Sequence, residues 1–216
     1  MSTQIKYTNI FGNPITAQQQ STLLDFKKMT FLSNDIKTIE IFEQVGDISY
    51  KSVKYFIDAT ENKQDIIQKY VDPSTNSNLV IFSNRIQANG FDLWDWESYE
   101  RSSEIYFKGK EVFDGQLRTV FVCSFNKSTN ALLPGSQKYY HGNQFVSPTE
   151  DLLLEFIYDA NGNVDLVFDS NENYGYIEGI SLATFLDDAN LSQDVFPWDE
   201  HPYYHSVLPY LPFGNL

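Results

Sequence analysis

Apolar and polar residues alternate along much of the chain, and this period-two pattern predicts β-strands. Residues 37–43 and residues 51–57 each carry apolar side chains at every second position, and Gly46-Asp47 lies between the two runs. Because Gly-Asp favours a tight turn, we expect these two runs to pair as a β-hairpin.

The clearest hairpin pattern covers residues 105–125. Asp114-Gly115 separates two alternating runs, and this dipeptide suits a type I′ turn. The second run is apolar on both faces, as is typical of a central strand. We therefore expect Phe121 and Cys123 to be buried. Asn161-Gly162 predicts a further hairpin over residues 152–168.

Helical patterns are fewer and are marked by capping residues. Thr16 and Gln19 form a capping-box pattern that predicts a helix over about residues 17–31. Apolar residues at helical spacing predict a second helix that ends before Pro73. Ser181 is placed to cap a third helix, over about residues 182–189. The sequence thus predicts an α+β fold, mainly an antiparallel sheet of about nine strands in sequential hairpins, with about three helices.

A single domain over residues 1–216 is the simplest organisation for a chain of this length. The loop at residues 126–148, rich in Gly, Ser and Asn, is the one plausible subdivision. With 42% hydrophobic and 16% aromatic residues, the chain can bury a sizeable core.

Charge divides the chain unevenly. Residues 139–216 contain 13 acidic residues and no lysine or arginine, whereas residues 1–138 have a net charge of −1. The negative field over this acidic third disfavours nucleic acid and anionic membranes as partners, and it suits a basic protein partner. Solubility alone is the alternative explanation.

Several features predict a cytoplasmic protein without a cofactor. Cys123 is the single cysteine, so the chain cannot form an internal disulfide. The N-terminal residues lack the apolar core of a signal peptide, and no apolar run approaches the ~20 residues of a membrane span. The sequence shows no glycine-rich phosphate loop, nucleophile elbow or Cys/His cluster.

Two segments carry oxygen or nitrogen ligands that a metal could use. Residues 159–165 alternate Asp and Asn as a calcium loop does, but Val164 and Ser170 replace the Gly and Glu of that pattern. A hairpin turn is the favoured interpretation. His201 and His205 are separated by Pro202, which prevents both from facing a metal on one helix. We expect no metal site.

Residues 91–97 interleave aromatic and acidic side chains. Asp92, Asp95 and Glu97 could supply the carboxylate pair of a carbohydrate-active or other hydrolase. The same segment could form a protein interface, or its Trp rings could lie in the core with the acids at the rim. The sequence leaves these alternatives open.

The acidic third also contains the candidate partner surface. Exposed acids beside aromatic anchors would combine rapid association with affinity. The candidate residues are Asp187, Asp188, Asp194, Phe196, Trp198, Asp199 and Glu200.

Three stretches resemble a hairpin-plus-helix unit found in immunity proteins of bacterial polymorphic toxin systems, of the contact-dependent or type VI-like kind. They begin at Thr38 (Thr-Ile-Glu-Ile-Phe-Glu-Gln), Ser52 (Ser-Val-Lys-Tyr-Phe-Ile-Asp) and Asp65 (Asp-Ile-Ile-Gln-Lys-Tyr), and residues 180–188 are similar to a C-terminal helix of some such proteins. Together they cover under a third of the chain and indicate no specific family. The resemblance implies a non-enzymatic protein that occludes a toxin domain. The hydrolase is the alternative, and the oligomeric state is left open.

Overall fold

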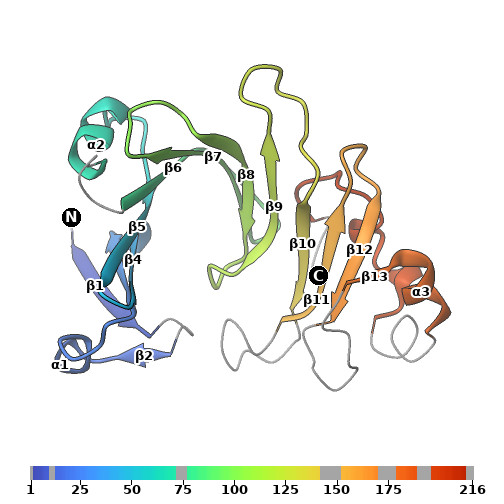
Figure 1. Cartoon of the computed structure of the whole chain (residues 1–216), viewed down its shortest axis with the longest axis horizontal. Helices are drawn as coiled ribbons and strands as arrows, with labels where there is room; N and C mark the ends of the chain where they lie inside the picture. The colour runs from blue at the N-terminus through green and yellow to red at the C-terminus, as the bar shows by residue number, and fades with distance from the viewer. Residues whose placement is uncertain are drawn as a thin grey trace. The chain divides into compact units, whose positions relative to one another are not determined.

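The computed structural model describes residues 2–9, 13–71, 77–141, 152–169, 179–188 and 196–212. Within them it contains thirteen β-strands, which are hydrogen-bonded in the order β13-β12-β11-β10-β9-β8-β7-β6-β5-β4-β3-β1-β2 (Figure 1). The strands β5 and β6 pair in parallel, and the other pairs with a defined register are antiparallel. The predicted α+β class with a mainly antiparallel sheet is therefore confirmed.

The strands are β1 (Thr3–Thr8), β2 (Pro14–Ile15), β3 (Phe26–Leu32), β4 (Asp35–Val45), β5 (Ile48–Phe56), β6 (Ser77–Ala88), β7 (Phe91–Glu100), β8 (Phe107–Phe113), β9 (Thr119–Phe125), β10 (Ser136–His141), β11 (Leu152–Tyr158), β12 (Val164–Asp169) and β13 (Ile180–Ser181). The α-helices are α1 (Ala17–Gln20), α2 (Lys63–Tyr70) and α3 (Leu182–Asp187), and the 3-10 helices are η3 (Trp198–Glu200) and η4 (Pro202–Tyr204). No described helix is long and apolar enough to cross a membrane.

Residue contacts divide the chain into two compact units. Unit 1 comprises residues 1–84, 95–108 and 147–149, and unit 2 comprises residues 85–94, 109–146 and 150–216. The division falls within strands β6, β7 and β8. The predicted single domain, with a possible subdivision near 126–148, stays a prediction.

Unit 1 contains the predicted hairpin as strands β4 and β5, with Gly46 in the turn at φ +61°. Helix α2 follows β5 and buries Ile66 and Ile67 against Val53 and Leu79. Because α2 connects two parallel strands, β5-α2-β6 is a crossover connection. This parallel pair was not part of the sequence prediction.

The prediction of a helix over residues 17–31 is wrong beyond its first turn. The capping box of Thr16 and Gln19 forms, but α1 ends at Gln20. Residues 26–32 form β3 instead, which pairs with β1 on one side and β4 on the other. Phe26 stacks on Phe42 of β4 with ring centroids 4.5 Å apart. Pairing on both edges thus outweighs the local helical preference of this segment.

Unit 2 contains the predicted hairpin as strands β8 and β9, and Phe121 and Cys123 are buried as predicted. The turn differs from the expected type I′. Leu117, rather than Gly115, takes the left-handed conformation, at φ +64°. The Asp114 N–H donates to the Arg118 carbonyl (3.0 Å). This is a three-residue loop that ends in a left-handed residue, a common hairpin connection.

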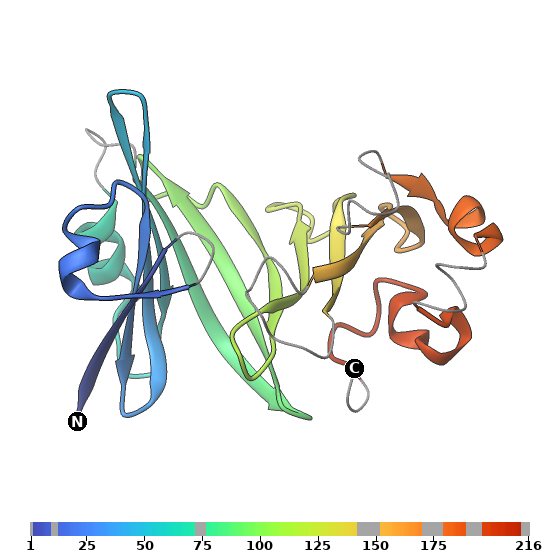
Figure 2. The same ribbon diagram turned by 90° about the horizontal axis from the view of Figure 1, so that it is seen from below.

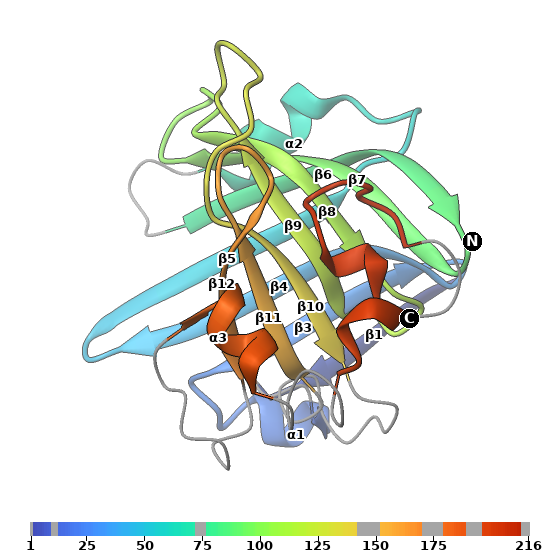
Figure 3. The ribbon, with the colours of Figure 1, turned by 90° about the vertical axis from the view of Figure 1, so that its right-hand side faces the viewer.

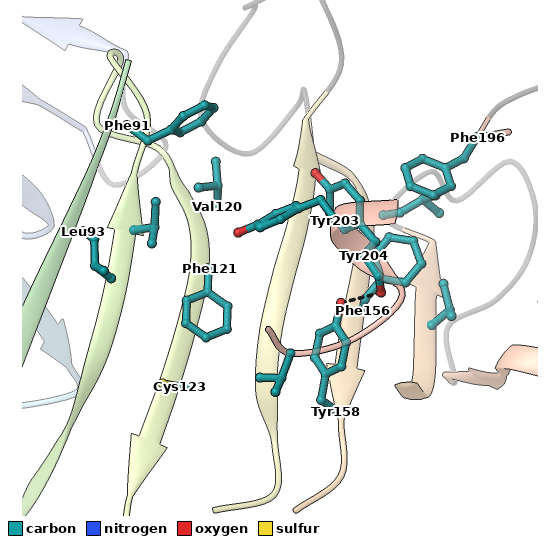
Figure 4. Close-up of a cluster of buried hydrophobic side chains, with 14 of the residues drawn as sticks. Phe91, Leu93, Val120, Phe121, Cys123, Phe156, Tyr158, Phe196, Tyr203 and Tyr204 are labelled. Carbon is teal, nitrogen blue, oxygen red and sulfur yellow. Dashed lines mark hydrogen bonds between the residues drawn. The ribbon is translucent and has the colours of Figure 1, made fainter. Parts of the chain in front are cut away.

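The core of unit 2 lies between its strands and the C-terminal segment, defined here as Phe196–Pro212. Aromatic rings dominate this core, and Tyr203 and Tyr204 of η4 pack among them (Figure 4). The Tyr158 hydroxyl donates to the Tyr204 carbonyl (2.8 Å). The C-terminal segment is thus a structural layer of the unit.

The C-terminal segment is also attached at the β11–β12 turn. The Val207 N–H donates to the Gly162 carbonyl (2.9 Å), and Asn163 and Ser206 form an isolated β-bridge. Gly162 has φ +84°, and a Cβ atom placed on it would lie 2.5 Å from Cγ1 of Val207.

We therefore expect Gly162→Ala to loosen this attachment and destabilise the protein. Gly90→Ala is the matched control, because Gly90 has φ +82° but nothing within 4 Å of its added Cβ. Both variants carry the strain of a positive φ, and only Gly162→Ala adds the clash, at a further cost of ~1–3 kcal/mol. Urea denaturation measures both values, and equal losses of stability would contradict the close approach of Val207 to Gly162.

Candidate functional site

The predicted partner residues lie on two short elements of the acidic third. Asp187 ends α3 and is exposed, whereas Asp188, its C-cap residue, is half-buried. Asp199 and Glu200 are exposed on η3. Asp194 lies outside the described residues. The structure thus gives solvent access to three of the predicted acids.

Phe196 cannot serve as the exposed apolar anchor that the sequence suggested. Its side chain is 0% exposed and stacks on the His201 ring with centroids 4.2 Å apart. Trp198 is half-buried, and it stacks on His205 (4.3 Å) while contacting the core. The reason is that the C-terminal segment turns its aromatic side chains inward, onto the sheet. Trp198 is therefore the one aromatic side chain of the predicted set with partial solvent access.

The two histidines take part in this packing. The His205 ring nitrogen Nε2 lies 2.8 Å from the Trp198 carbonyl oxygen, and burial lowers the pKa of His201. Within the described part of the chain, no group of three or more His, Cys, Asp or Glu side chains is arranged to hold a metal ion.

The 159–165 segment is a hairpin turn. Oδ1 of Asp159 accepts the backbone N–H groups of Asn161 and Asn163, both at 2.9 Å. Asp114 does the same for Gln116 and Arg118 in the β8–β9 turn. The two turns therefore use the same aspartate capping, and the oxygen ligands of residues 159–165 follow from turn chemistry.

The acids of residues 91–97 are each held by a separate partner. Trp94 is buried and Trp96 is half-buried, which agrees with the interpretation of this strand as core. The partners are Arg85 for Asp92, Asn84 for Asp95, and Lys63 and Tyr99 for Glu97.

A polar network that the sequence does not reveal lies on strands β10 and β11. Tyr139 is directly opposite Glu155 in the register. The Gln137 amide donates to Glu155 (2.6 Å), and the Tyr139 hydroxyl donates to the Gln137 oxygen (2.8 Å). Burial raises the pKa of the Glu155 carboxyl, and burial with the charge of Glu155 raises the pKa of Tyr139. Gln137 and Tyr139 of β10 meet Glu155 of β11 only because the two strands pair, so no sequence motif marks this network.

Lys138 of β10 fixes the position of the C-terminal segment. Its side chain is fully buried, and Nζ donates to the carbonyl oxygens of Tyr203 (2.5 Å), Ser206 (2.7 Å) and Pro209 (3.0 Å). Nζ also lies 3.7 Å from the centroid of the Tyr203 ring. Three acceptors match the three donors of an ammonium group. Lys138 therefore holds the segment that carries η3.

Unit 2 concentrates the negative charge of the chain. Its residues include 16 acidic and 5 basic side chains, a net charge of −11. Several basic groups of the unit have partners within it: Lys138 is buried, Arg85 pairs with Asp92 (2.7 Å), Arg118 pairs with Asp114 (2.6 Å) and Lys110 lies over the Tyr210 ring (6.0 Å).

Comparison with known proteins adds no assignment, since no protein-family model, curated protein or solved structure matches the chain.

The burial of Lys138 predicts a pH-dependent stability. Burial lowers its pKa from 10.5 to about 7, so the folded protein releases this proton near pH 7 while the unfolded chain keeps it up to about pH 10.5. The unfolded state thus binds more protons in this window, and the free energy of unfolding rises with pH. We expect a rise of roughly 3 kcal/mol between pH 7 and about 9.5.

Urea denaturation of the wild type and of Lys138→Met, over this pH range, isolates the contribution of Lys138. The free energy of unfolding of the wild type relative to that of the variant should rise by this amount, because the tyrosines whose pKa burial raises titrate in both proteins. A difference between the two proteins that stays constant with pH would show that the three carbonyl groups keep Lys138 charged.

Proposed function

We propose that this chain is a non-enzymatic binding protein, an immunity protein that neutralises a basic toxin domain in the cytoplasm by covering it. The observation that carries the proposal is the net charge of −11 on unit 2. Such a charge attracts a basic partner and accelerates encounter. The resemblance of residues 38–70 to immunity proteins supports the same class of function.

The exposed acids of α3 and η3 are the part of this surface that we assign to partner binding. Asp187, Asp199 and Glu200 are exposed, and the half-buried Trp198 ring of η3 contacts Phe185 of α3, with centroids 6.1 Å apart. The aromatic ring would contribute affinity by desolvation, and the acids would contribute orientation and association rate. Lys138 supports this arrangement because it holds the backbone that follows η3.

A hydrolase using Asp92, Asp95 and Glu97 is the second candidate. Its support is weaker, because each of these carboxylates already has its own partner. A general acid needs a carboxyl group with a raised pKa, and the structure has such a group in Glu155 of β11, outside residues 91–97. A glycosidase would need two carboxyl groups converging on one substrate bond.

The test is co-expression with a toxin domain encoded by the adjacent gene. The wild-type chain should protect cells, and Asp187→Lys with Asp199→Lys should weaken protection by slowing association about tenfold at low salt. Asp65→Lys with Glu104→Lys is the control, because both acids are exposed in unit 1. Full protection by the α3/η3 variant would overturn the assignment of this surface, and the lack of any adjacent toxin gene would contradict the proposed function.

A further inference from the structure

The end of the β4–β5 hairpin extends past its neighbouring strands. Pairing of β3 with β4 stops at Phe42, and pairing of β6 with β5 begins at Lys51. Residues 43–50, named here the arm, therefore form a two-stranded ribbon with no third strand among the described residues. Figures 2 and 3 both draw this ribbon beyond the adjoining strand β3 of unit 1.

Among the described residues, few contacts hold the arm to the rest of unit 1. Its two strands pair with each other from Glu43↔Tyr50 to Val45↔Ile48. Outside this ladder, the Gln44 N–H donates to Oδ1 of Asp25 (2.8 Å). A two-stranded ribbon without further packing is marginally stable in water. Contact with another surface would stabilise it.

The arm presents apolar side chains on one face. Val45 and Ile48 are directly paired and Tyr50 lies two residues further along the same strand, so all three share a face. Their exposed fractions are 67%, 48% and 39%. Gln44 and Ser49 occupy the opposite face. Apolar side chains gathered in this way are typical of an interaction site rather than of scattered surface residues.

The charges of the arm indicate which partner suits it. Glu43 is exposed opposite Tyr50, and Asp47 is exposed in the turn. The cation that follows, Lys51, is bound to Glu40 (2.8 Å). An apolar face with an acidic border complements a basic surface that contains apolar residues, and it repels an anionic membrane. A second copy of this chain, with a net charge of −14, is disfavoured for the same reason.

We propose that the arm is a docking element for a basic, partly apolar protein surface, with Val45, Ile48 and Tyr50 as its contact residues. This inference rests on the proposed function. It concerns an apolar contact on unit 1 and is separate from the acidic surface assigned on unit 2. Val45 and Ile48 are paired with each other and share a face with Tyr50, so the arm gathers exposed apolar area at one place.

The experiment uses the full chain and a dye-labelled amphipathic peptide of leucine and lysine, with fluorescence anisotropy as the readout at physiological salt. A peptide of equal charge, with glutamine in place of leucine, separates apolar binding from charge alone. Val45→Ser with Ile48→Ser should weaken binding of the leucine peptide at least tenfold. Ile5→Ser is the matched control, because Ile5 is also 48% exposed on a strand of unit 1. Its binding should equal that of the wild type.

Three results would overturn the inference. The first is equal affinity of the wild type for the leucine and glutamine peptides. The second is that Ile5→Ser weakens binding of the leucine peptide as much as Val45→Ser with Ile48→Ser does. The third is that the wild type sediments as a dimer and that Val45→Ser with Ile48→Ser dissociates it. Melting curves should coincide for wild type and variants, because the altered side chains are exposed. Failure of toxin protection with intact peptide binding at the arm would count against the proposed function alone. If the protein protects cells from the toxin but binds both peptides equally, the result would count against the arm alone.

Discussion

A single buried lysine holds the C-terminal segment of this chain at three points. The C-terminal segment contains no lysine or arginine, and three of its backbone carbonyl groups accept hydrogen bonds from one side chain of strand β10. Lys138, the last basic residue of the sequence, supplies three N–H donors to three of these carbonyls. Burying an ammonium group without a carboxylate is costly, which is why its pKa falls to about 7. Tyr203 and Tyr204 of the same segment also pack into the buried aromatic core of unit 2.

The sequence predicted the hairpins well because turn residues and two-residue alternation act locally. The β8–β9 hairpin and the burial of Phe121 and Cys123 are examples. It failed where neighbours in space decide the outcome. Residues 26–32 became a strand through pairing on both edges, and the parallel alignment of β5 and β6 has no local signal.

The candidate site was predictable only in part, for the same reason. Acidic residues at 187, 199 and 200 could be expected on the surface from their charge, and they are exposed. The burial of Phe196 depends on a segment folding back onto the sheet, where it meets His201. The exposed apolar arm could not be inferred either, because its exposure follows from where β3 and β6 stop pairing.

The proposed function divides binding between two parts of the chain. Under this proposal, the charge of unit 2 would govern the rate of encounter, and the apolar arm and Trp198 would govern the lifetime of the complex. The most direct test is stopped-flow association of the wild-type chain with its toxin domain over a range of salt concentrations. The account predicts that the association rate falls at least tenfold from low to high salt, with little change in the dissociation rate. An association rate independent of salt would contradict the claim that the acidic surface directs binding.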